Sequence, residues 1–427
     1  MLTAIVGTNW GDEGKGRMVD LLSSDYDVVI RYQGGNNAGH TVVNERGKFI
    51  LNLLPSGILR ETTINVLGNG MVIDIEHLCN EIQSLMDKGI KITPDNLKIS
   101  DKAIICMPYH KLLDILEEDR LGDAKFGSTR RGIAPVYSDK YMKKGIRMGD
   151  LLSPESLRDK VEPIVEWKNL TVHDAYKSES LRVDDILDWL KKYGEVVKDY
   201  ICDTTYFLIK AIKEKKNILF EAQLGALRDI DFGIYPYTSS SYTLASYAPI
   251  GSGIPFMQLD NTIGIMKAYS SCVGEGPFTV ELFGEEAETL RAAGGEYGAA
   301  TGRPRRLGYF DVVASKYGAI IQGATSIALT KLDILSYLTE IPICVGYEID
   351  GVVTTEFPAG DRLLRAKPVY EYLEGFHCDI SKCRKPGDLP PAALSYIKYI
   401  EKAIDCPIRY VSVGAERNDY ILLGDGK

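Results

Sequence analysis

Short hydrophobic runs alternate with polar, glycine-rich segments along the first hundred residues. Four of these runs have the length of buried strands: residues 2–6, 27–31, 51–57 and 64–67. Residues 75–88 instead place apolar side chains at helical spacing, and Gly89 follows them as a typical helix terminator. Strands that alternate with helices predict an α/β fold, with a mostly parallel central sheet flanked by helices and its loops gathered on one edge.

The later parts of the chain have a different pattern. Residues 101–200 are dense in charged residues and helical periodicity, which indicates a helical insertion. Beyond the insertion, a strand at 217–221 returns to the central sheet. Strands at 326–330 and 408–413 and one amphipathic helix at 393–404 form an α+β C-terminal portion. Because no Pro/Gly/Ser-rich linker separates these segments, we expect one compact chain over 1–427. Its sub-parts are 1–100 with 201–265 (central sheet and loops), 101–200 (insertion) and 266–427.

Composition narrows the class of protein. A chain of 427 residues that is 45% hydrophobic supports a sizeable core, and a net charge of −9 with a pI of about 5.3 disfavours a nucleic-acid groove. The eight cysteines include no CxxC pair, which suits a reducing cytoplasm, and His377, Cys378 and Cys383 fit no zinc spacing well. With no charged leader and no apolar run long enough to span a bilayer, we expect a soluble cytoplasmic protein without a membrane partner.

The first candidate site is the glycine loop at residues 7–17, which lies between a predicted strand and a predicted helix. This layout aims backbone N–H groups and a positive helix end at an anion. The spacing is not that of a Walker A loop, and the loop carries an acid pair, Asp12 and Glu13. One interpretation is a glycine turn closed by a solvated acid pair. The other is a phosphoryl-transfer site, with Asp12 as base or metal ligand and Lys15 on a phosphate.

Polar loops after later strands supply further candidates. Residues 33–41 combine three glycines with amides and His40, a candidate catalytic histidine. Basic loops at 127–135, 143–147 and 298–306 suit an anionic ligand in so acidic a chain, although solvated helix ends are the alternative. The run of four hydroxyl residues at 238–241 is a candidate phosphate or base contact.

The strand at 326–330 ends in a nucleotide signal. A carboxylate at Asp333 can accept both the N1–H and the 2-amino hydrogens of guanine, whereas adenine offers an acceptor at N1. The stem of Lys331 can cover the purine face. The loop at 414–417, after another strand, suits the far side of the same base.

Seven of these segments, taken in order, resemble the adenylosuccinate synthetase family: WGDEGKG, QGGNNAGH, the loop at 127–140, DIDFGIYP, TGRPRR, TKLD and VGAER. The resemblance implies a homodimeric enzyme that joins L-aspartate to IMP with GTP as co-substrate and Mg²⁺ as cofactor, through a 6-phosphoryl intermediate. It implies that Asp12, His40 and Lys15 are catalytic and that Asp12 and the Gly39 carbonyl bind Mg²⁺.

The same resemblance assigns the substrate sites. IMP would be bound by Asn37, Thr129, Arg130, Lys143, Gln223, Ser239 and Arg303. Aspartate would be bound by Ala300, Thr301 and Arg303. GTP would be bound by Gly11, Gly14, Lys15, Gly16, Arg305, Lys331, Asp333, Ser412 and Gly414.

The chain departs from the family mainly on the acceptor side. Arg130 replaces a glycine, and Lys143 replaces an arginine that reaches the partner's IMP. The glutamine that contacts the base in the family is shifted by one position, so Leu224 occupies its usual place and the glutamine here is Gln223. Ser239 and Ala300 each replace a threonine. These changes are either a compensated phosphate site that keeps IMP, or a base pocket for another 6-oxopurine monophosphate such as dGMP. A catalytically silent nucleotide sensor is the rival from a different class.

Overall fold

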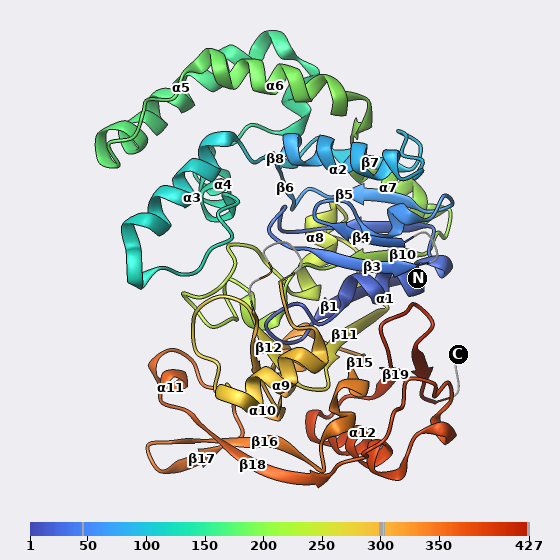
Figure 1. Cartoon of the computed structure of the whole chain (residues 1–427). Coiled ribbons are helices and arrows are strands. Elements are labelled where there is room, and N and C mark those ends of the chain that lie inside the picture. The colour runs from blue at the N-terminus through green and yellow to red at the C-terminus, as the bar shows by residue number, and fades with distance from the viewer. Residues whose placement is uncertain (45–46, 299–301, 303, 425–427) are drawn as a thin grey trace.

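A ten-stranded sheet runs through the middle of the molecule (Figure 1). The computed structural model describes residues 1–44, 47–298, 302 and 304–424. The strand order is β20-β19-β15-β11-β1-β10-β2-β5-β7-β9, and every pair is parallel except β19 with β20. The strands are β1 (Leu2–Gly7), β2 (Val28–Arg31), β5 (Ile64–Leu67), β7 (Leu97–Ser100), β9 (Ile201–Cys202), β10 (Ile218–Glu221), β11 (Asn261–Lys267), β15 (Ser326–Thr330), β19 (Ile408–Ser412) and β20 (Tyr420–Leu422).

The centre of this sheet is buried on both faces, as parallel sheets require. All residues of β1, β2, β10 and β15 are buried, which explains why the sequence shows continuous apolar runs there. In the register, Ala4 lies opposite Phe220 on β10 and Thr262 on β11. The carboxyl ends of β15, β11, β1, β10 and β2 therefore share one edge, and the loops that leave them meet there.

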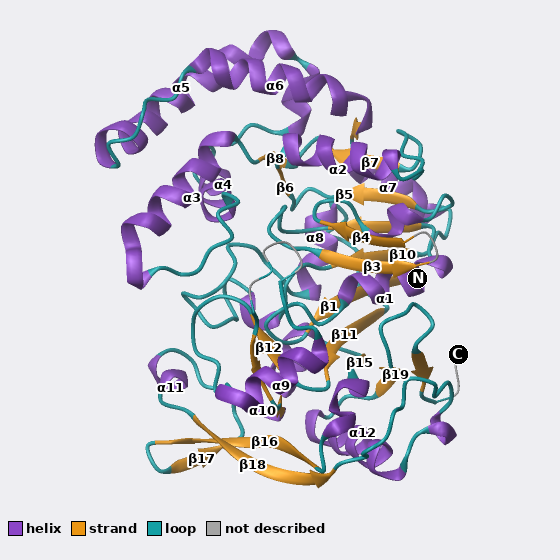
Figure 2. Cartoon of the chain, viewed as in Figure 1, coloured by secondary structure: helices purple, strands orange, loops and turns teal. Residues whose placement is uncertain are grey.

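Helices cover the faces of the sheet, and three of them begin at an aspartate cap. Asp74, Asp203 and Asp311 accept backbone N–H groups at the starts of α2 (Ile75–Asp87), α7 (Thr204–Lys213) and α10 (Val312–Gln322). The other helices of this part are α1 (Lys15–Leu22), α8 (Ala248–Ser252), α9 (Gly284–Gly294), α11 (Asp361–Leu364) and α12 (Pro391–Ile404). Figure 2 shows how they and the loops frame the strands.

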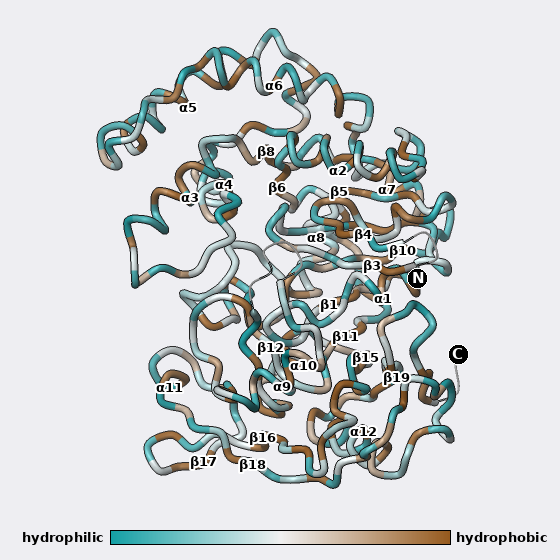
Figure 3. Tube along the Cα trace, viewed as in Figure 1, coloured by the Kyte–Doolittle hydropathy of each residue, from teal (hydrophilic) through white to brown (hydrophobic). Residues whose placement is uncertain are grey.

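Residues 101–200 form a mainly helical region beyond one end of the sheet (Figures 1 and 2). It contains α3 (Pro108–Leu121), α4 (Ile133–Tyr141), α5 (Leu157–Asn169) and α6 (Val183–Val197). The buried faces of α5 and α6 carry Val161, Val165, Ile186 and Leu190, which belong to the same core cluster as α2. Hydrophilic and hydrophobic stretches accordingly alternate along these two helices in Figure 3. The expected helical insertion is confirmed.

The C-terminal portion adds a second, smaller sheet at the opposite end of the molecule. Its strands are β14 (Phe310–Asp311), β16 (Glu340–Ile349), β17 (Val352–Thr354) and β18 (Lys367–Glu374). Three strand pairs complete the structure: β3 (His40–Asn44) with β4 (Gly47–Leu51), β6 (Val72–Ile73) with β8 (Ile104–Ile105), and β12 (Ser270–Cys272) with β13 (Arg306–Gly308). The predicted fold, a mostly parallel α/β sheet with an α+β C-terminal portion, is confirmed.

One predicted strand is wrong. Of residues 51–57 only Leu51 is in a strand, and a 3₁₀ helix, Ser56–Leu59, follows. The backbone N–H groups of Asn52 and Leu53 donate to the carboxylate of Glu81, at 2.8 and 2.9 Å, so a side chain replaces a neighbouring strand as their partner. Pro55, which has no N–H, begins the turn. No helix in the described part of the chain is long and apolar enough to cross a membrane.

Candidate active site

The loop between β1 and α1 separates the two members of its acid pair. Glu13 is buried, and its Oε1 accepts the N–H groups of Asn9 and Gly11 at 3.1 and 2.8 Å. Lys15 Nζ lies 2.6 Å from its other oxygen, Oε2. Glu13 therefore holds the loop in shape from the inside, a role that the sequence analysis did not assign. Asp12 is left exposed, with a left-handed φ of 60°.

Asp12 is paired with an arginine from the third part of the chain. Its Oδ2 lies 3.1 Å from Arg305 Nε, in an ion pair without hydrogen-bond geometry. Arg305 Nη1 donates to Glu296 Oε2 at 2.6 Å. The predicted base and a predicted GTP contact therefore meet at this edge of the sheet.

Glu296 is the centre of a buried ion cluster that also includes Lys267, at the end of β11, and Lys331, after β15. Both lysines donate to Glu296, with Nζ to Oε1 distances of 2.9 Å. The three cations hold the pKa of Glu296 below its usual range although burial raises it, and burial lowers the pKa of Lys267 to about 8. One carboxylate faces three cations, so the cluster has spare positive charge next to Asp12. That arrangement suits an anionic ligand.

The second glycine loop brings His40 against the first. A Cβ at Gly16 would lie 2.7 Å from the Cβ of His40, so only glycine fits there. His40 is buried, and its Nδ1 lies 2.5 Å from Glu221 Oε1 at the end of β10. Arg31 Nη2 lies 3.0 Å from Nδ1 and 3.2 Å from Nε2 of His40. Because the ionised Glu221 carboxylate can only accept, His40 Nδ1–H donates to it, and in a neutral ring Nε2 is then the acceptor.

The electrostatics of this group keep the imidazole neutral. Burial and the charge of Arg31 lower the pKa of His40 to about 4, in spite of the opposing effect of Glu221. Burial alone would raise the pKa of Glu221. The charge of Arg31 and the hydrogen bond from His40 outweigh burial and lower this pKa to about 2. A neutral histidine beside an ionised glutamate can donate a hydrogen bond but carries no positive charge at pH 7.

The predicted base contacts on the acceptor side are connected to one another. Ser239 and Ser241 hydroxyls lie 3.0 Å apart, Ser241 Oγ donates to Gln33 Oε1 at 2.9 Å, and Gln33 Nε2 donates to the carbonyl of Gln223 at 2.9 Å. The amide of Gln223 is itself fully buried, and neither of its polar atoms has a hydrogen-bond partner among the described residues. It lies against Gly34, where a Cβ would come within 2.7 Å of Gln223 Oε1.

The remaining candidates for IMP and Mg²⁺ occupy more accessible positions. They are Asn37, Gly39 and the residues of the basic loops at 127–135 and 143–147. Asn37 Oδ1 accepts the N–H of Gly35 at 3.2 Å, and Gly39 is half-buried. Thr129, Arg130 and Lys143 are exposed, and Arg130 and Lys143 have left-handed φ values of 56° and 60°.

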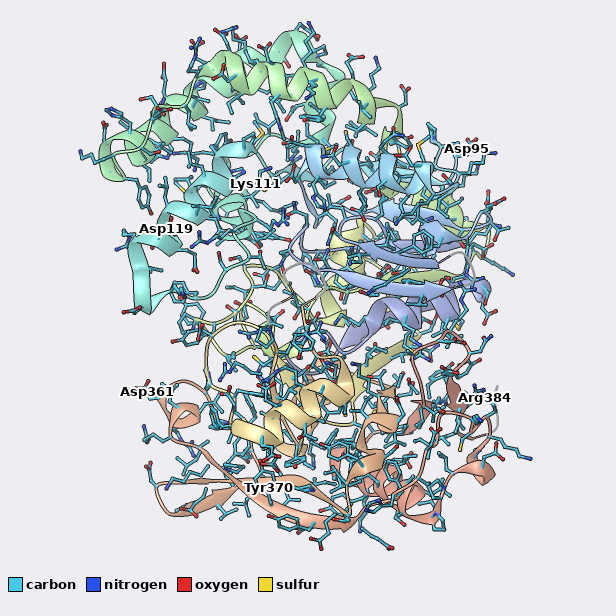
Figure 4. All side chains as sticks on the ribbon, in the orientation of Figure 1. Asp95, Lys111, Asp119, Asp361, Tyr370 and Arg384 are labelled. Atoms are coloured by element: carbon cyan, nitrogen blue, oxygen red, sulfur yellow. The ribbon has the colours of Figure 1, made fainter. Side chains whose placement is uncertain are left out.

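Arg130 is engaged away from the two glycine loops. Its Nη2 lies 2.7 Å from an oxygen of Asp119 on α3, which Figure 4 labels. Both side chains of this ion pair are exposed, so the pair is weak. Arg130 is therefore available to a phosphate ligand at little cost.

The guanine candidates lie at the ends of β15 and β19. Lys331 has a left-handed φ of 60°, and its Nζ donates to the Gly294 carbonyl at 2.6 Å. One carboxylate oxygen of Asp333 is buried without a partner among the described residues, and burial raises its pKa. Ser412 Oγ donates to the Gly414 carbonyl at 3.1 Å. A buried, unpaired acceptor is what a guanine N–H would satisfy.

Three predicted residues cannot be placed. Ala300, Thr301 and Arg303, expected to hold aspartate, lie outside the described residues. Arg305 N donates to the Glu296 carbonyl at 3.0 Å. The part of the chain that the structure describes has no group of three His, Cys, Asp or Glu side chains arranged for a metal, and all eight cysteines are free.

A parallel sheet with these loops at its carboxyl edge defines an α/β nucleotide-dependent enzyme. The sequence matches adenylosuccinate synthetase over residues 4–421. The adenylosuccinate synthetase of Caldanaerobacter subterraneus subsp. tengcongensis is 45% identical over 423 residues, which cover 99% of both chains. That of Brachyspira hyodysenteriae is 45% identical over 420 residues, which cover 98% of both. The chain therefore belongs to the adenylosuccinate synthetase family, whose members are ligases.

Solved structures agree with this assignment. The chain resembles the fully ligated adenylosuccinate synthetase of Plasmodium falciparum with a TM-score of 0.93 and 37% identity, covering 99% of this chain and 100% of that one. A cyanophage succinoaminodeoxyadenylate synthetase, bound to dGMP and dATP, has a TM-score of 0.61 at 18% identity. The second similarity shows a shared fold alone.

Proposed function

We propose that this enzyme joins the amine of L-aspartate to C6 of IMP at the expense of GTP, giving adenylosuccinate, GDP and phosphate. Family membership over residues 4–421 supports the reaction. The observation that carries the assignment of roles is the different environment of the two acids. Glu13 accepts hydrogen bonds inside its own loop, whereas Asp12 is exposed in the loop after β1, beside Arg305.

In the proposed chemistry, Asp12 takes the N1 proton of the hypoxanthine, and the electron pair moves to O6. O6 then attacks the γ-phosphorus of GTP, the bond to GDP breaks, and a 6-phosphoryl intermediate forms. The aspartate amine attacks C6, phosphate leaves with the former O6, and the amine loses a proton. As substrates enter, Arg305 moves from Asp12 Oδ2 to the phosphates, which frees both oxygens of the carboxylate for hypoxanthine N1–H and Mg²⁺.

His40 and Lys15 stabilise the charge that develops on the phosphoryl group. In the structure His40 Nδ1 contacts Glu221, and both ring nitrogens lie close to Arg31. His40 therefore turns from Glu221 toward the nucleotide, and as a neutral imidazole it donates a hydrogen bond. Lys15, next to Gly14 and Gly16, contributes a positive charge at the start of α1.

The proposed Mg²⁺ ligands are Asp12 and the Gly39 carbonyl, with GTP oxygens completing the set. The donors fit, because Mg²⁺ prefers oxygen ligands and the Asp12 carboxylate is exposed. When bound, Mg²⁺ neutralises phosphate charge. Activity that survives complete removal of divalent cations by a chelator would contradict this assignment.

The acceptor nucleotide is assigned as IMP, bound by Asn37, Thr129, Gln223 and Ser239, with Arg130 on its 5′-phosphate. We further propose a cytoplasmic homodimer in which Lys143 of one subunit completes the site of the other. Lys143 is exposed, which leaves it free to reach a partner. Mixing inactive Asp12→Ala and Lys143→Ala chains should restore partial activity through hybrid dimers. Proven subunit exchange without recovery would argue for self-contained sites.

The experiment on the catalytic roles uses Asp12→Ala and His40→Ala, with Asp95→Ala, at an exposed position, as the matched surface control. Each catalytic variant should lose turnover by about a hundredfold or more while GTP binding remains within a few-fold of the parent. The control should keep both. Near-normal turnover in both catalytic variants would reject the assigned roles, and a parent that binds GTP without turnover would favour the nucleotide sensor.

A further inference from the structure

Arg17, the third residue of α1, reaches a loop at the far end of the chain. Its Nη1 donates to Ser412 Oγ at 2.7 Å and to the Gly414 carbonyl at 2.5 Å. Its Nη2 donates to the Asp419 carbonyl at 3.0 Å and also contacts the Glu416 carbonyl. One guanidinium therefore serves four acceptors of the segment 412–419, which we call the guanine loop.

A second tie joins the same helix to the guanine loop. Asp20, one turn after Arg17 and 1% exposed, forms a bidentate ion pair with Arg417, with oxygen–nitrogen distances of 2.6 and 2.7 Å. Inside the loop, Val413 N donates to the Asp419 carbonyl at 2.9 Å, and Glu416 N donates to an Asp419 carboxylate oxygen at 2.9 Å. The other Asp419 oxygen accepts from Arg384 at 2.8 Å, on the side of the molecule where Figure 4 labels that arginine.

Arg17 also connects the loop with the carboxylate proposed to recognise guanine. Its partners by hydrogen bond are neutral oxygens, so its charge acts on nearby carboxylates, Asp419 and Asp333. Asp333 has the unpaired buried oxygen described above. The nearby cation Arg17 favours the ionised form of the Asp333 carboxylate, which is the form that accepts two guanine N–H groups.

We propose that Arg17 is a positioning residue for GTP. Arg17 holds the guanine loop on the first turn of α1, the helix that begins at the proposed phosphate contact Lys15. It thereby fixes the base end of the GTP site relative to the phosphate end. This inference rests on the proposed GTP site. The mechanism above does not use Arg17, whose side chain is engaged by the guanine loop.

The geometry requires the planar fork of arginine. Four acceptors from four residues are satisfied by two nitrogens of one rigid group, whereas the ammonium of lysine is a single point with three donors. Arg17→Lys should therefore keep the charge near Asp333 but release part of the loop. Arg17→Met keeps most of the stem and removes both.

The test compares Arg17→Met and Arg17→Lys with Arg409→Met, an exposed arginine on β19. The KM values for GTP, IMP and aspartate are measured, and amide hydrogen exchange is followed at Val413, Glu416 and Asp419. In Arg17→Met the KM for GTP should rise roughly tenfold or more, the KM values for IMP and aspartate should change less than about twofold, and the three amides should exchange faster. Arg17→Lys should fall between this variant and the parent, and the control should match the parent.

Two results would overturn the proposal: an unchanged KM for GTP in Arg17→Met, or equal rises in all three KM values, which would indicate a general loss of structure. If Arg17→Met does not fold, Arg17→Lys decides the matter by the same KM split and exchange rates. Failure of the GTP site itself looks different, because the parent enzyme would then use ATP as well as GTP whatever residue stands at 17.

Discussion

His40 and Glu221 form a buried pair in which Nδ1 of the histidine lies 2.5 Å from Oε1 of the glutamate. Glu221 also accepts the N–H and the hydroxyl of Ser56, at 2.7 and 2.8 Å, and lies 3.9 Å from Arg31. The proposed catalytic histidine is therefore held in its neutral form against the end of β10. In the proposed mechanism it leaves Glu221 when the nucleotide binds.

Removing the charge of Glu221 should destabilise the protein. Glu221→Gln leaves the fully buried Arg31 without its main countercharge, with only Glu81 remaining, so the free energy of unfolding should fall by about 3 kcal/mol. Ser56→Ala removes one hydrogen bond to the same carboxylate and should cost only about 1 kcal/mol. Chemical denaturation measures both values. A Glu221→Gln protein as stable as Ser56→Ala would show that the carboxylate does not neutralise Arg31.

Guanine selectivity should depend on Asp333. In Asp333→Asn one acceptor becomes a donor that opposes the guanine N–H groups. The ratio of kcat/KM for GTP to that for ATP should therefore fall by roughly fivefold to 150-fold, which corresponds to a loss of about 1–3 kcal/mol of discrimination. Ser336→Ala is the control, because Ser336 Oγ contacts only the backbone carbonyl of Asp333. An unchanged ratio in Asp333→Asn would place guanine recognition elsewhere.

The stability of the α10 cap should depend on pH. Burial raises the pKa of Asp311 from 3.8 to about 6, although its oxygens accept from Ala314 N and Tyr347 OH. The folded state therefore binds a proton more tightly than the unfolded state, so this stabilisation is full below about pH 4 and is lost as the pH rises through 6.

Asp311→Asn abolishes that loss. Relative to the parent, the variant should gain about 1 kcal/mol of stability between about pH 5 and about pH 8, measured by denaturation at both values. Asp203→Asn, at the cap of α7, is the control, because Lys102 and backbone N–H groups lower the pKa of Asp203 in spite of burial. The same gain in both variants would mean that burial of Asp311 is not its cause.

Local patterns predicted much of this structure. The apolar runs at 2–6 and 326–330 are β1 and β15, and residues 75–88 are α2 with one residue fewer. The prediction for residues 51–57 was wrong because the carboxylate of Glu81, distant in sequence, takes the N–H groups that a strand would have paired.

The site could be predicted only in its first layer. Asp12 and His40 stand in recognisable loops, and Arg305, the partner of Asp12, lies in the TGRPRR motif, but Glu296 and Glu221, which hold Arg305 and His40, belong to no motif. Glu221 at the end of a predicted strand was the one available signal, whereas nothing in the local sequence marks Glu296. Arg17 directly follows the first motif, WGDEGKG, yet its role depends on carbonyl groups about four hundred residues away.

The most direct test of the central claim follows the oxygen at C6. IMP labelled at O6 with a heavy oxygen isotope is incubated with GTP, aspartate and Mg²⁺, and the released phosphate is analysed by mass spectrometry. Because O6 attacks the γ-phosphorus and leaves with it, the phosphate should carry one labelled oxygen for each adenylosuccinate formed. Phosphate without the label, at full product yield, would contradict a 6-phosphoryl intermediate and with it the role proposed for Asp12.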